Sequence, residues 1–304
     1  MTDQQQQERH RVSAWRRRLL GWFYRRPGAT SGALVAPGLG WLVVFFLVPT
    51  VIMLVYSFMP RGTYGGIETG ITGEHYHRFA DELYVKILWH SVLQSFICTV
   101  LCLLIGYPVA WVIAHAGRYK HFLTFLVVLP LWTSVLLRTF AVIFLLRDTG
   151  LVNTLLIALG IIDEPLSLLY TSTAIQIGLL YSFLPFMILP IYVSLEKMDP
   201  SLGEAAEVLG ARPVARFFRI TLPLSMPGVV AGSLLVFIPA LGSYLPSDLL
   251  GGAKHMMIGN LVQNQFTGAR NWPFGSAVSF VMMAVVLLAV VGYLRVRDRA
   301  NEGA

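Results

Sequence analysis

Long apolar stretches alternate with short polar ones along the chain. Several of the apolar runs approach or exceed the roughly 20 residues that a helix needs to cross a bilayer. Six such segments are predicted, at 34–58, 87–114, 122–146, 172–195, 224–245 and 274–294. The first and the last contain no charged side chain. The pattern therefore predicts an all-α polytopic membrane protein with six transmembrane helices.

Composition agrees with this pattern. Hydrophobic residues make up 56% of the chain and charged residues only 13%, about half of the roughly 25% found in soluble domains. The expected organisation is a tail at 1–33, a membrane domain at 34–296 with its core at about 87–294, and a second tail at 297–304. The first 30 residues are polar and rich in arginine, and lack the apolar core of a cleavable signal peptide.

The distribution of Lys and Arg predicts the orientation, because cytoplasmic loops carry an excess of these residues. Sixteen of them lie in the two tails and in the 2–3 and 4–5 loops, and six lie in the opposite loops. Both termini are therefore expected in the cytoplasm. The net charge of +7 reflects this bias and gives no reason to expect nucleic-acid binding.

The N-terminal tail has a feature of its own. Trp15, Leu19 and Trp22 recur at helical spacing among arginines, which is typical of a basic helix lying in the lipid headgroup layer. A solvated basic tail is the alternative.

Three features in or near the membrane segments suggest structure rather than chemistry. Cys98 and Cys102 lie one turn apart without further ligands, so we expect them to pack in the interior. His75 and His77 are too sparse for a metal site, and no metal is expected. The 147–171 loop contains an apolar stretch too short to span, which predicts a helix against the outer face of the bundle.

Signatures of catalysis are absent from the sequence. There is no GxxxxGK[ST] phosphate loop, no HExxH, no CxxC and no GxSxG. Membrane segments also lack the chain of acids expected of a proton-driven pump. An enzyme is therefore not expected, and energy for active transport would come from another chain.

The stretch EAAEVLGARPVARFFRITLP lies between the fourth and fifth segments. Asp199 and Pro200 before it are a typical helix start, and Gly210 is a natural helix stop. Pro213 can open a second short helix that returns to the membrane. The pattern predicts a helix–turn–helix projection with small residues at its tip, either a docking element or an ordinary loop.

This stretch resembles the signature loop of ABC-importer permeases without a gap. The loop is expected at 196–223, and the matching positions are Glu204, Ala205, Ala206, Gly210, Ile220, Leu222 and Pro223. In that family the loop is the coupling helix, which seats in a cleft of the ATP-hydrolysing subunit. The resemblance implies a type I ABC importer permease fold, with no cofactor in this chain and ATP-Mg on the partner ATPase.

Other segments are similar to spermidine/putrescine permeases. They are LLIGYPVAWVIAH, LPLWTSVLLRTFA, LPFMILPIYVSL and LLVFIPALGSYLPSDLLGGAKHMMIGN, followed by NWPFGSA. The resemblance implies a polyamine cargo and three kinds of partner: ATP-binding subunits, a second homologous permease subunit and a periplasmic substrate-binding protein. The alternatives are the same machine for an opine, sulfate, thiamine or phosphonate-like solute, or an ion-coupled secondary transporter.

Polyamines are flexible polycations, so their path needs carboxylates, carbonyls and aromatic faces. Asp248 and Tyr244 lie one turn apart at the outward end of the fifth segment if the helix continues across Pro246. Together they are predicted to form an outer mouth, with a solvated helix end as the alternative for Asp248. Trp132 and Trp272 are candidate aromatic walls or, equally, interfacial anchors.

Two further features are expected to serve structure. Arg138 lies inside the third segment, where a cation is costly, so it should have a structural partner or lie near the outer interface. Gly228 and Gly232 form a GxxxG pair in the fifth segment, which predicts a close contact with another helix or subunit.

Overall fold

The computed structural model describes residues 27–252 and 255–302. These belong to two compact units, which divide between Tyr56 and Ser57. The predicted basic helix around Trp15 and Trp22 lies outside the described residues.

The first unit contains the first membrane segment. Helix α2 (Pro27–Leu42) continues through a π-turn, η1 (Val43–Leu47), into α3 (Val48–Ser57). Val35–Ser57 is long and apolar enough to span a membrane, as predicted for 34–58. Pro49 is the second residue of α3, just beyond the π-turn, and its missing N–H removes one hydrogen bond of a regular α-helix.

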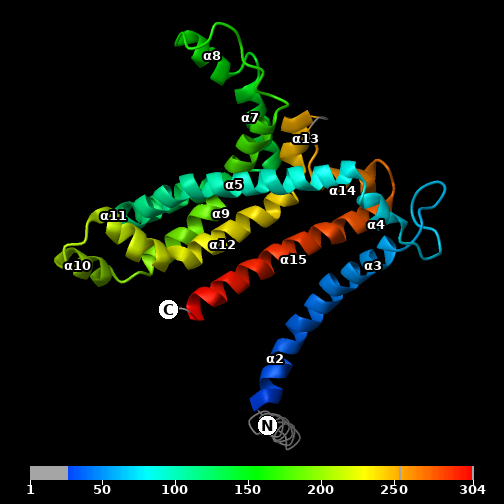
Figure 1. Cartoon of the computed structure of the whole chain (residues 1–304), viewed down its shortest axis with the longest axis horizontal. Helices are drawn as coiled ribbons and strands as arrows, with labels where there is room; N and C mark the ends of the chain where they lie inside the picture. The colour runs from blue at the N-terminus through cyan, green and yellow to red at the C-terminus, as the bar shows by residue number, and fades with distance from the viewer. Residues whose placement is uncertain (1–26, 253–254, 303–304) are drawn as a thin grey trace, which may run out of the picture. The chain divides into compact units, whose positions relative to one another are not determined.

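The second unit is helical throughout its regular elements (Figure 1). Its longer helices are α5 (Glu82–His115), α7 (Val135–Leu146), α9 (Ser172–Glu196), α12 (Leu222–Leu241) and α15 (Trp272–Glu302). Its shorter elements are α4 (Glu74–Phe79), η2 (Gly117–Tyr119), α6 (Lys120–Val128), η3 (Leu129–Trp132), α8 (Leu151–Ala158), α10 (Pro200–Val208), α11 (Pro213–Arg216), η4 (Phe217–Thr221), α13 (Leu245–Gly251) and α14 (Ile258–Thr267). Among described residues, six helical segments are apolar enough to span a membrane, which confirms the predicted class.

Helices α5, α9 and α12 form the core of this unit. Each contributes fully buried side chains to one apolar cluster, including Cys102 on α5, Ile191 on α9 and Val236 on α12. The two cysteines lie in this cluster as free thiols, as expected for packing residues. A hydrogen bond of 2.8 Å between Tyr107 Oη and Ser225 Oγ adds a polar tie between α5 and α12.

Small residues let these helices approach closely. A Cβ on Gly228 would lie 2.5 Å from the carbonyl oxygen of Pro190, and one on Gly232 would lie 2.8 Å from Met187 Sδ. Real Cβ atoms do not make such contacts. At Gly228 the contact is with backbone, so only glycine fits there, whereas at Gly232 the flexible Met187 side chain could shift and the nearest backbone atom would lie 3.1 Å away. The predicted GxxxG contact is therefore a contact between two helices of the same chain.

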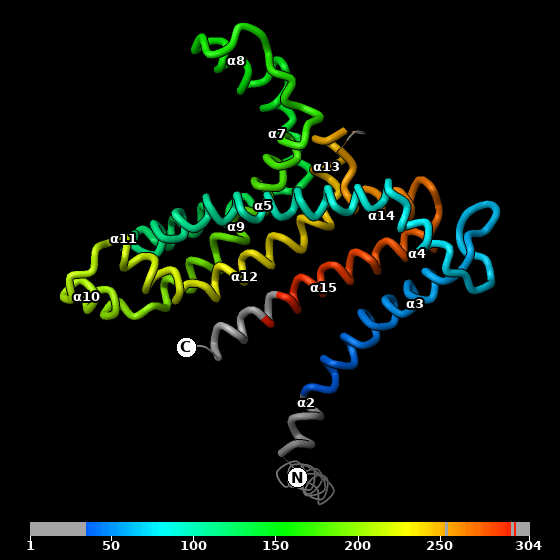
Figure 2. The backbone as a smooth tube through the Cα atoms, viewed as in Figure 1, coloured from blue at the N-terminus to red at the C-terminus, as the bar shows by residue number. Residues whose placement is uncertain are grey.

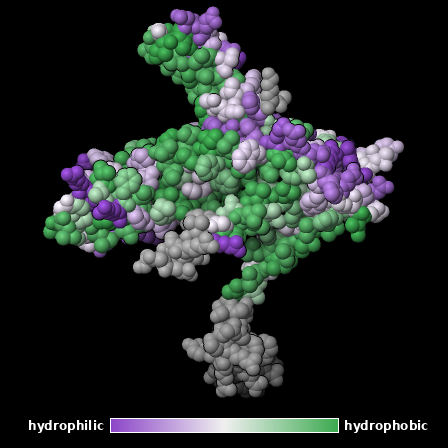
Figure 3. Space-filling model, in the orientation of Figure 1, coloured by the Kyte–Doolittle hydropathy of each residue, from purple (hydrophilic) through white to green (hydrophobic). Residues whose placement is uncertain are grey.

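The two ends of the bundle differ. At one end α10 and α11 form a projecting helix pair, and at the other lie α4, α14 and the 58–73 loop (Figure 1). The loop is fixed to the turn before α15, because Arg61 Nη2 donates to the carbonyl of Ala269 at 2.9 Å and the Gly66 N–H to that of Arg270 at 2.9 Å. Polar surface gathers at the end that carries α4 and α14, the α10 end is mixed, and apolar surface covers the middle (Figure 3).

The third membrane segment departs from the prediction of one helix at 122–146. α6 ends at Val128 and α7 begins at Val135, with the η3 turn and extended Thr133 and Ser134 between them. Pro130 cannot continue the hydrogen bonding of α6, and Ser134 Oγ caps α7 by accepting from the Leu136 N–H. By length and composition the spanning segment is Val135–Ala158, although the helix is interrupted at 147–150.

The expected helix of the 147–171 loop exists as α8, but the prediction that it lies against the bundle is wrong. α8 contacts α7 instead, and the two project from the bundle beside α13 (Figures 1 and 2). Asn153 fixes this arrangement: its Nδ2 donates to the carbonyls of Arg147 and Leu166, and its Oδ1 accepts from the Leu166 N–H. We call α7, α8 and the return to residue 166 the arm.

The fifth segment also ends earlier than predicted. α12 stops at Leu241 rather than 245, and α13 begins at Leu245 as a separate short helix. At the other end of this segment, α11, η4 and α12 form one continuous helical run that begins at Pro213. The short helix predicted after Pro213 is therefore the first part of the membrane helix itself.

Candidate coupling and transport sites

The projecting helix α10 begins and ends as its sequence predicts. Asp199 caps it, because its Oδ1 accepts a hydrogen bond of 2.9 Å from the Ser201 N–H, and Pro200 occupies the first turn. This hydrogen bond lowers the pKa of the Asp199 carboxyl. The cap fixes where α10 leaves the end of α9.

The end of α10 is a complete Schellman motif. The Ala211 N–H donates to the carbonyl of Ala206 and the Gly210 N–H to that of Glu207, both at 2.9 Å. Gly210 has a φ of +77°, a conformation that side chains other than glycine rarely adopt. The tight turn brings the chain directly to Pro213 and α11.

The predicted coupling residues divide between two sides of this element. Glu204, Ala205, Gly210 and Pro223 are exposed, Ala206 is buried, and Ile220 and Leu222 are half-buried. The exposed alanine and glycine leave backbone open to a partner, whereas the buried and half-buried residues hold the element to the bundle. Phe217 contributes to this attachment by packing edge-on against Tyr107, with ring centroids 5.5 Å apart.

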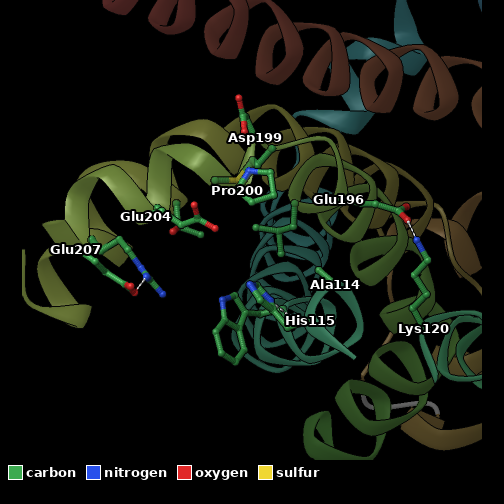
Figure 4. Close-up of a pocket in the computed structure, with 14 residues that line it drawn as sticks. Ala114, His115, Lys120, Glu196, Asp199, Pro200, Glu204 and Glu207 are labelled. Carbon is green, nitrogen blue, oxygen red and sulfur yellow. Dashed lines mark hydrogen bonds and ion pairs between the residues drawn. The ribbon is translucent and has the colours of Figure 1, made fainter. Parts of the chain in front are cut away.

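A pocket of about 450 Å³ lies between α10 and the ends of α5 and α9. Glu204 and Glu207 approach it from α10, and Ala114 and His115 face them from α5 (Figure 4). Glu204 therefore lies at the rim of the pocket while remaining exposed. The pocket leaves space beneath α10, so α10 is not packed against the bundle along its whole length.

Two ion pairs flank this pocket. Lys120 Nζ lies 2.7 Å from Glu196 Oε1, which joins α6 to the end of α9. Arg216 of α11 pairs with Glu207 of α10 across the turn. The hydrogen bond to Glu196 raises the pKa of the Lys120 ammonium. Sequence analysis missed both pairs. Lys120 and Glu196 are separated by 76 residues in the sequence, so no spacing pattern would indicate that pair.

Tyr244 and Asp248 were expected to lie one helical turn apart only if the chain is helical across Pro246, and it is helical there. The Asp248 N–H donates to the Tyr244 carbonyl at 2.8 Å, so the two residues lie one helical turn apart on α13. Both side chains are exposed. The Tyr244 carbonyl also accepts a hydrogen bond of 3.0 Å from Asn260 Nδ2, which fixes the start of α13 to α14.

The two candidate aromatic walls lie on other elements. Trp132 is 75% exposed in the break between α6 and α7. Trp272 begins α15, where its Nε1 donates to the Phe266 carbonyl at 3.2 Å. Among the described residues, no ring contact or hydrogen bond joins either tryptophan to Tyr244 or Asp248. The structure thus brings together Tyr244 and Asp248 but not all four residues.

Similar proteins identify the family. Residues 103–299 match the family of binding-protein-dependent transport system inner membrane components. The spermidine/putrescine transport system permease protein PotB of Haemophilus influenzae is 44% identical over 86% of this chain and 92% of its own length. PotB of Escherichia coli is 41% identical over 86% of this chain and 96% of its own length. This chain belongs to that family of inner-membrane permeases.

Solved structures show the same fold for this permease. A chain of a bacterial ABC transporter that imports alginate superposes with a TM-score of 0.67 at 18% identity, covering 93% of this chain and 99% of that chain. A chain of the MetNI methionine transporter superposes with a TM-score of 0.53 at 16% identity, covering 70% and 94%. The predicted importer-permease fold is confirmed.

The region matched to the permease family contains both candidate sites. It begins within α5 and includes α10, the two ion pairs and α13, whereas α2, α3 and α4 precede it. Within the described part of the chain, no group of three or more His, Cys, Asp or Glu could hold a metal ion.

The permease also has a polar cluster that sequence analysis did not find. On α5, His90 Nε2 lies 3.2 Å from Gln94 Nε2, and Gln176 Nε2 of α9 donates to the Gln94 carbonyl at 2.8 Å. His255 Nδ1 lies 3.1 Å from Ser172 Oγ, and its ring centroid is 6.1 Å from that of His90. The cluster ties α5 and α9 to the segment between α13 and α14.

Proposed function

We propose that this chain is a polyamine-conducting permease subunit of an ATP-driven importer. The likeness to the spermidine/putrescine permeases, which extends over nearly their whole length, is the observation that carries the proposal. The chain itself would perform no chemistry. Its role would be to open one path alternately to either side of the membrane.

Orientation follows from the excess of Lys and Arg in the tails and in the loop that contains α10. Both termini and α10 would face the cytoplasm, and α4, α13 and α14 the opposite side. In this orientation α10 is available to a cytoplasmic ATPase that binds ATP and Mg²⁺.

The coupling role of α10 is supported by how it is attached. Exposed Glu204 and Ala205 would contact the ATPase, and the turn at Gly210 would pass the movement of α10 to α11. Since α11, η4 and α12 are continuous, a displacement of α10 would turn α12 against α9, with which α12 packs through Gly228 and Gly232. The pocket beneath α10 provides room for that displacement.

At the other end, a periplasmic binding protein would deliver the polyamine, and a second homologous permease would complete the path. The carboxylate of Asp248 and the ring of Tyr244 are suited to an ammonium group by charge and by cation–π attraction. Trp132 and Trp272 would contribute aromatic surface only if the second subunit or a conformational change brings them to the path.

Uptake into membrane vesicles containing the complete importer tests the proposal. Putrescine, spermidine, sulfate and thiamine would be compared with and without trapped ATP, for the wild type and for Glu204→Lys. Glu164→Lys is the matched control, because Glu164 is also an exposed acid but lies in the arm loop away from α10.

ATP-dependent polyamine uptake that is lost in Glu204→Lys and retained in Glu164→Lys is the expected result. Uptake of sulfate or thiamine in place of polyamines would support the importer assignment but contradict the polyamine assignment. Transport that is indifferent to ATP and to Glu204 would reject the coupling role of α10.

A further inference from the structure

Two histidines meet in the polar cluster that joins α5, α9 and the segment between α13 and α14. The ring centroids of His90 and His255 lie 6.1 Å apart, with an interplanar angle of 30°. Both residues are half-buried, so protons can reach the rings while water screens a charge on either ring only in part. Histidine is the side chain that ordinarily changes charge between about pH 5 and pH 8, so this pair can respond to pH in that range.

The hydrogen bonds around His90 fit its neutral form. Gln176 Nε2 donates to the main-chain carbonyl of Gln94 at 2.8 Å and also to Gln94 Oε1, and these two acceptors fix the orientation of both amides. Gln94 Nε2 therefore faces His90 Nε2, at 3.2 Å. Because an amide nitrogen can only donate, His90 Nε2 must be the acceptor and carries no hydrogen.

Protonation of His90 would break this chain of bonds. Both nitrogens of an imidazolium carry hydrogen, so His90 Nε2 and Gln94 Nε2 would then be two donors facing each other. Turning the Gln94 amide does not resolve the conflict, because its nitrogen would then face Gln176 Nε2. His255 differs in this respect: its Nδ1 lies 3.1 Å from Ser172 Oγ, and a hydroxyl can donate or accept. His90 is thus the more sensitive ring, and a charge on His255 would add repulsion.

Other charged and titratable side chains lie on the elements around the pair. They are those of Glu82 and Lys86 on α5, Arg138 on α7, Tyr170 before α9, Tyr244 and Asp248 on α13, and Lys254, which precedes His255 in the sequence and lies outside the described residues. Lys86 and Glu82 pair with each other at 2.5 Å, and residues 172–180 of α9 and the whole of α14 carry no charged side chain. Carboxylates, lysines, arginines and tyrosines ordinarily keep one charge state between about pH 5 and pH 8, so a change of charge in this range comes from the histidines.

The pair lies where the segment between α13 and α14 is fastened to the bundle. Ser247 Oγ of α13 donates to the His255 carbonyl at 3.0 Å. The Ile258 N–H, at the start of α14, donates to Ser91 Oγ of α5 at 2.7 Å. The segment therefore meets α5 at two adjacent positions, 90 and 91, and is tied at its other end to the helix that carries Asp248.

We propose that His90 and His255 form a proton-sensitive latch on the segment between α13 and α14. With both rings neutral, the bonds of Gln94 and Ser172 hold the two histidines in contact, and the segment stays on α5 and α9. Protonation at acidic pH would break the bond between His90 and Gln94, add repulsion between the rings, and loosen the segment together with α13. The latch rests on the proposed function only for the assignment of this end to the outward side and for its effect on uptake.

Amide hydrogen exchange of the complete importer in detergent tests the latch directly, because exchange reports local opening. Wild type, His90→Gln and His255→Gln would be compared at about pH 7.5 and about pH 5.5, on either side of the ordinary histidine range. Protection factors remove the intrinsic pH dependence of exchange. His77→Gln is the matched control, because His77 is an exposed histidine on α4, at the same end of the bundle.

We expect the protection of amides 255–261 to fall severalfold at the lower pH in the wild type and in His77→Gln. In His90→Gln and His255→Gln it should change little between the two pH values. No fall in the wild type would overturn the latch, and so would an equal fall in the wild type and both latch variants. Each latch variant tests the pair by itself, so the test remains decisive if one of them does not fold.

Uptake provides a second readout. In vesicles whose outward side faces the medium, ATP-dependent uptake should fall severalfold at the lower pH of the medium, and less so in His90→Gln and His255→Gln than in the wild type and His77→Gln. A pH dependence of the binding protein is the same for every variant, so this comparison isolates the latch. Equal pH profiles in the wild type and all variants would overturn the effect on transport. Exchange that responds as expected in a chain that transports no polyamine would support the latch and contradict the proposed cargo.

Discussion

Arg216 on α11 forms an ion pair with Glu207 in the last turn of α10, so the two helices on either side of the Gly210 turn are tied directly. The pair is partly exposed, and such pairs stabilise a protein by only about 0.2–1 kcal/mol. Its importance would therefore lie in keeping α10 and α11 moving together rather than in overall stability.

Breaking this pair should uncouple the ATPase from transport. We expect Arg216→Gln to lower ATP-dependent uptake several-fold, while ATP hydrolysis and the thermal stability of the complex change little. Charge exchange, with Arg216→Glu and Glu207→Arg together, should restore part of the uptake. Equal losses of uptake and hydrolysis in Arg216→Gln would instead indicate that the ATPase no longer binds.

Gly210 and Gly203 provide opposite tests of α10. Gly210→Ala places a Cβ in a left-handed conformation and should destabilise the turn by about 1 kcal/mol. Gly203→Ala lies within the helix and meets nothing closer than 3.9 Å, so it should stabilise α10 by up to about 1 kcal/mol. Hydrogen exchange of the 200–210 amides should accelerate in the first variant and slow in the second. The same change in exchange rate in both variants would mean that the left-handed conformation at position 210 does not require glycine.

The Asp199 cap makes the start of α10 sensitive to acid. Because the folded pKa of Asp199 is lowered, the cap contributes stability above the ordinary carboxyl pKa of about 4, and this contribution is lost as pH falls through the folded value. Hydrogen exchange of the first turn of α10 should therefore rise below about pH 4 in the wild type. Asp199→Asn keeps a capping oxygen but has no titratable group. In this variant the hydrogen exchange of the first turn of α10 should therefore not show the rise at low pH.

The local features of the coupling segment could be predicted because they are encoded by neighbouring residues. Asp199 with Pro200 begins a helix, and Gly210 ends one, wherever the surrounding chain allows it. The number of membrane segments follows in the same way from length and apolar composition, whereas the bounds of the third and fifth do not. Ion pairs such as Lys120 with Glu196 could not be predicted, since only tertiary folding brings their elements together.

The errors also have physical causes. Pro130 was visible within the third segment, but prolines are common in membrane helices, and whether one bends or interrupts a helix depends on what caps the next turn. Ser134 supplies that cap here. The apolar stretch of the 147–171 loop is too short to span, which predicts a helix against the bundle. Its length and composition do not determine which surface that helix contacts, and in the structure α8 contacts α7.

Gly228 should tolerate no side chain. A Cβ there would lie 2.5 Å from the Pro190 carbonyl oxygen and from Ser194 Oγ, and backbone cannot move aside easily in a packed helix pair. We expect Gly228→Ala to reduce the folded fraction in detergent severalfold, as measured by size-exclusion chromatography. Gly292→Ala on α15 meets nothing within 4 Å and should elute as the wild type does. A well-folded Gly228→Ala would contradict the close crossing of α12 and α9.

Asp248 tests the outer mouth, and its side chain is exposed on α13, so its replacement should not disturb folding. If its carboxylate attracts polyamines, Asp248→Asn should raise the substrate concentration needed for half-maximal uptake about tenfold, with more effect on spermidine than on putrescine because spermidine carries more charge. Higher ionic strength should narrow the difference from the wild type, since salt screens exposed charges. Asp163→Asn, in the exposed arm loop, is the control. Unchanged uptake at every polyamine concentration would instead mean that Asp248 is a solvated residue near a helix start with no part in the path.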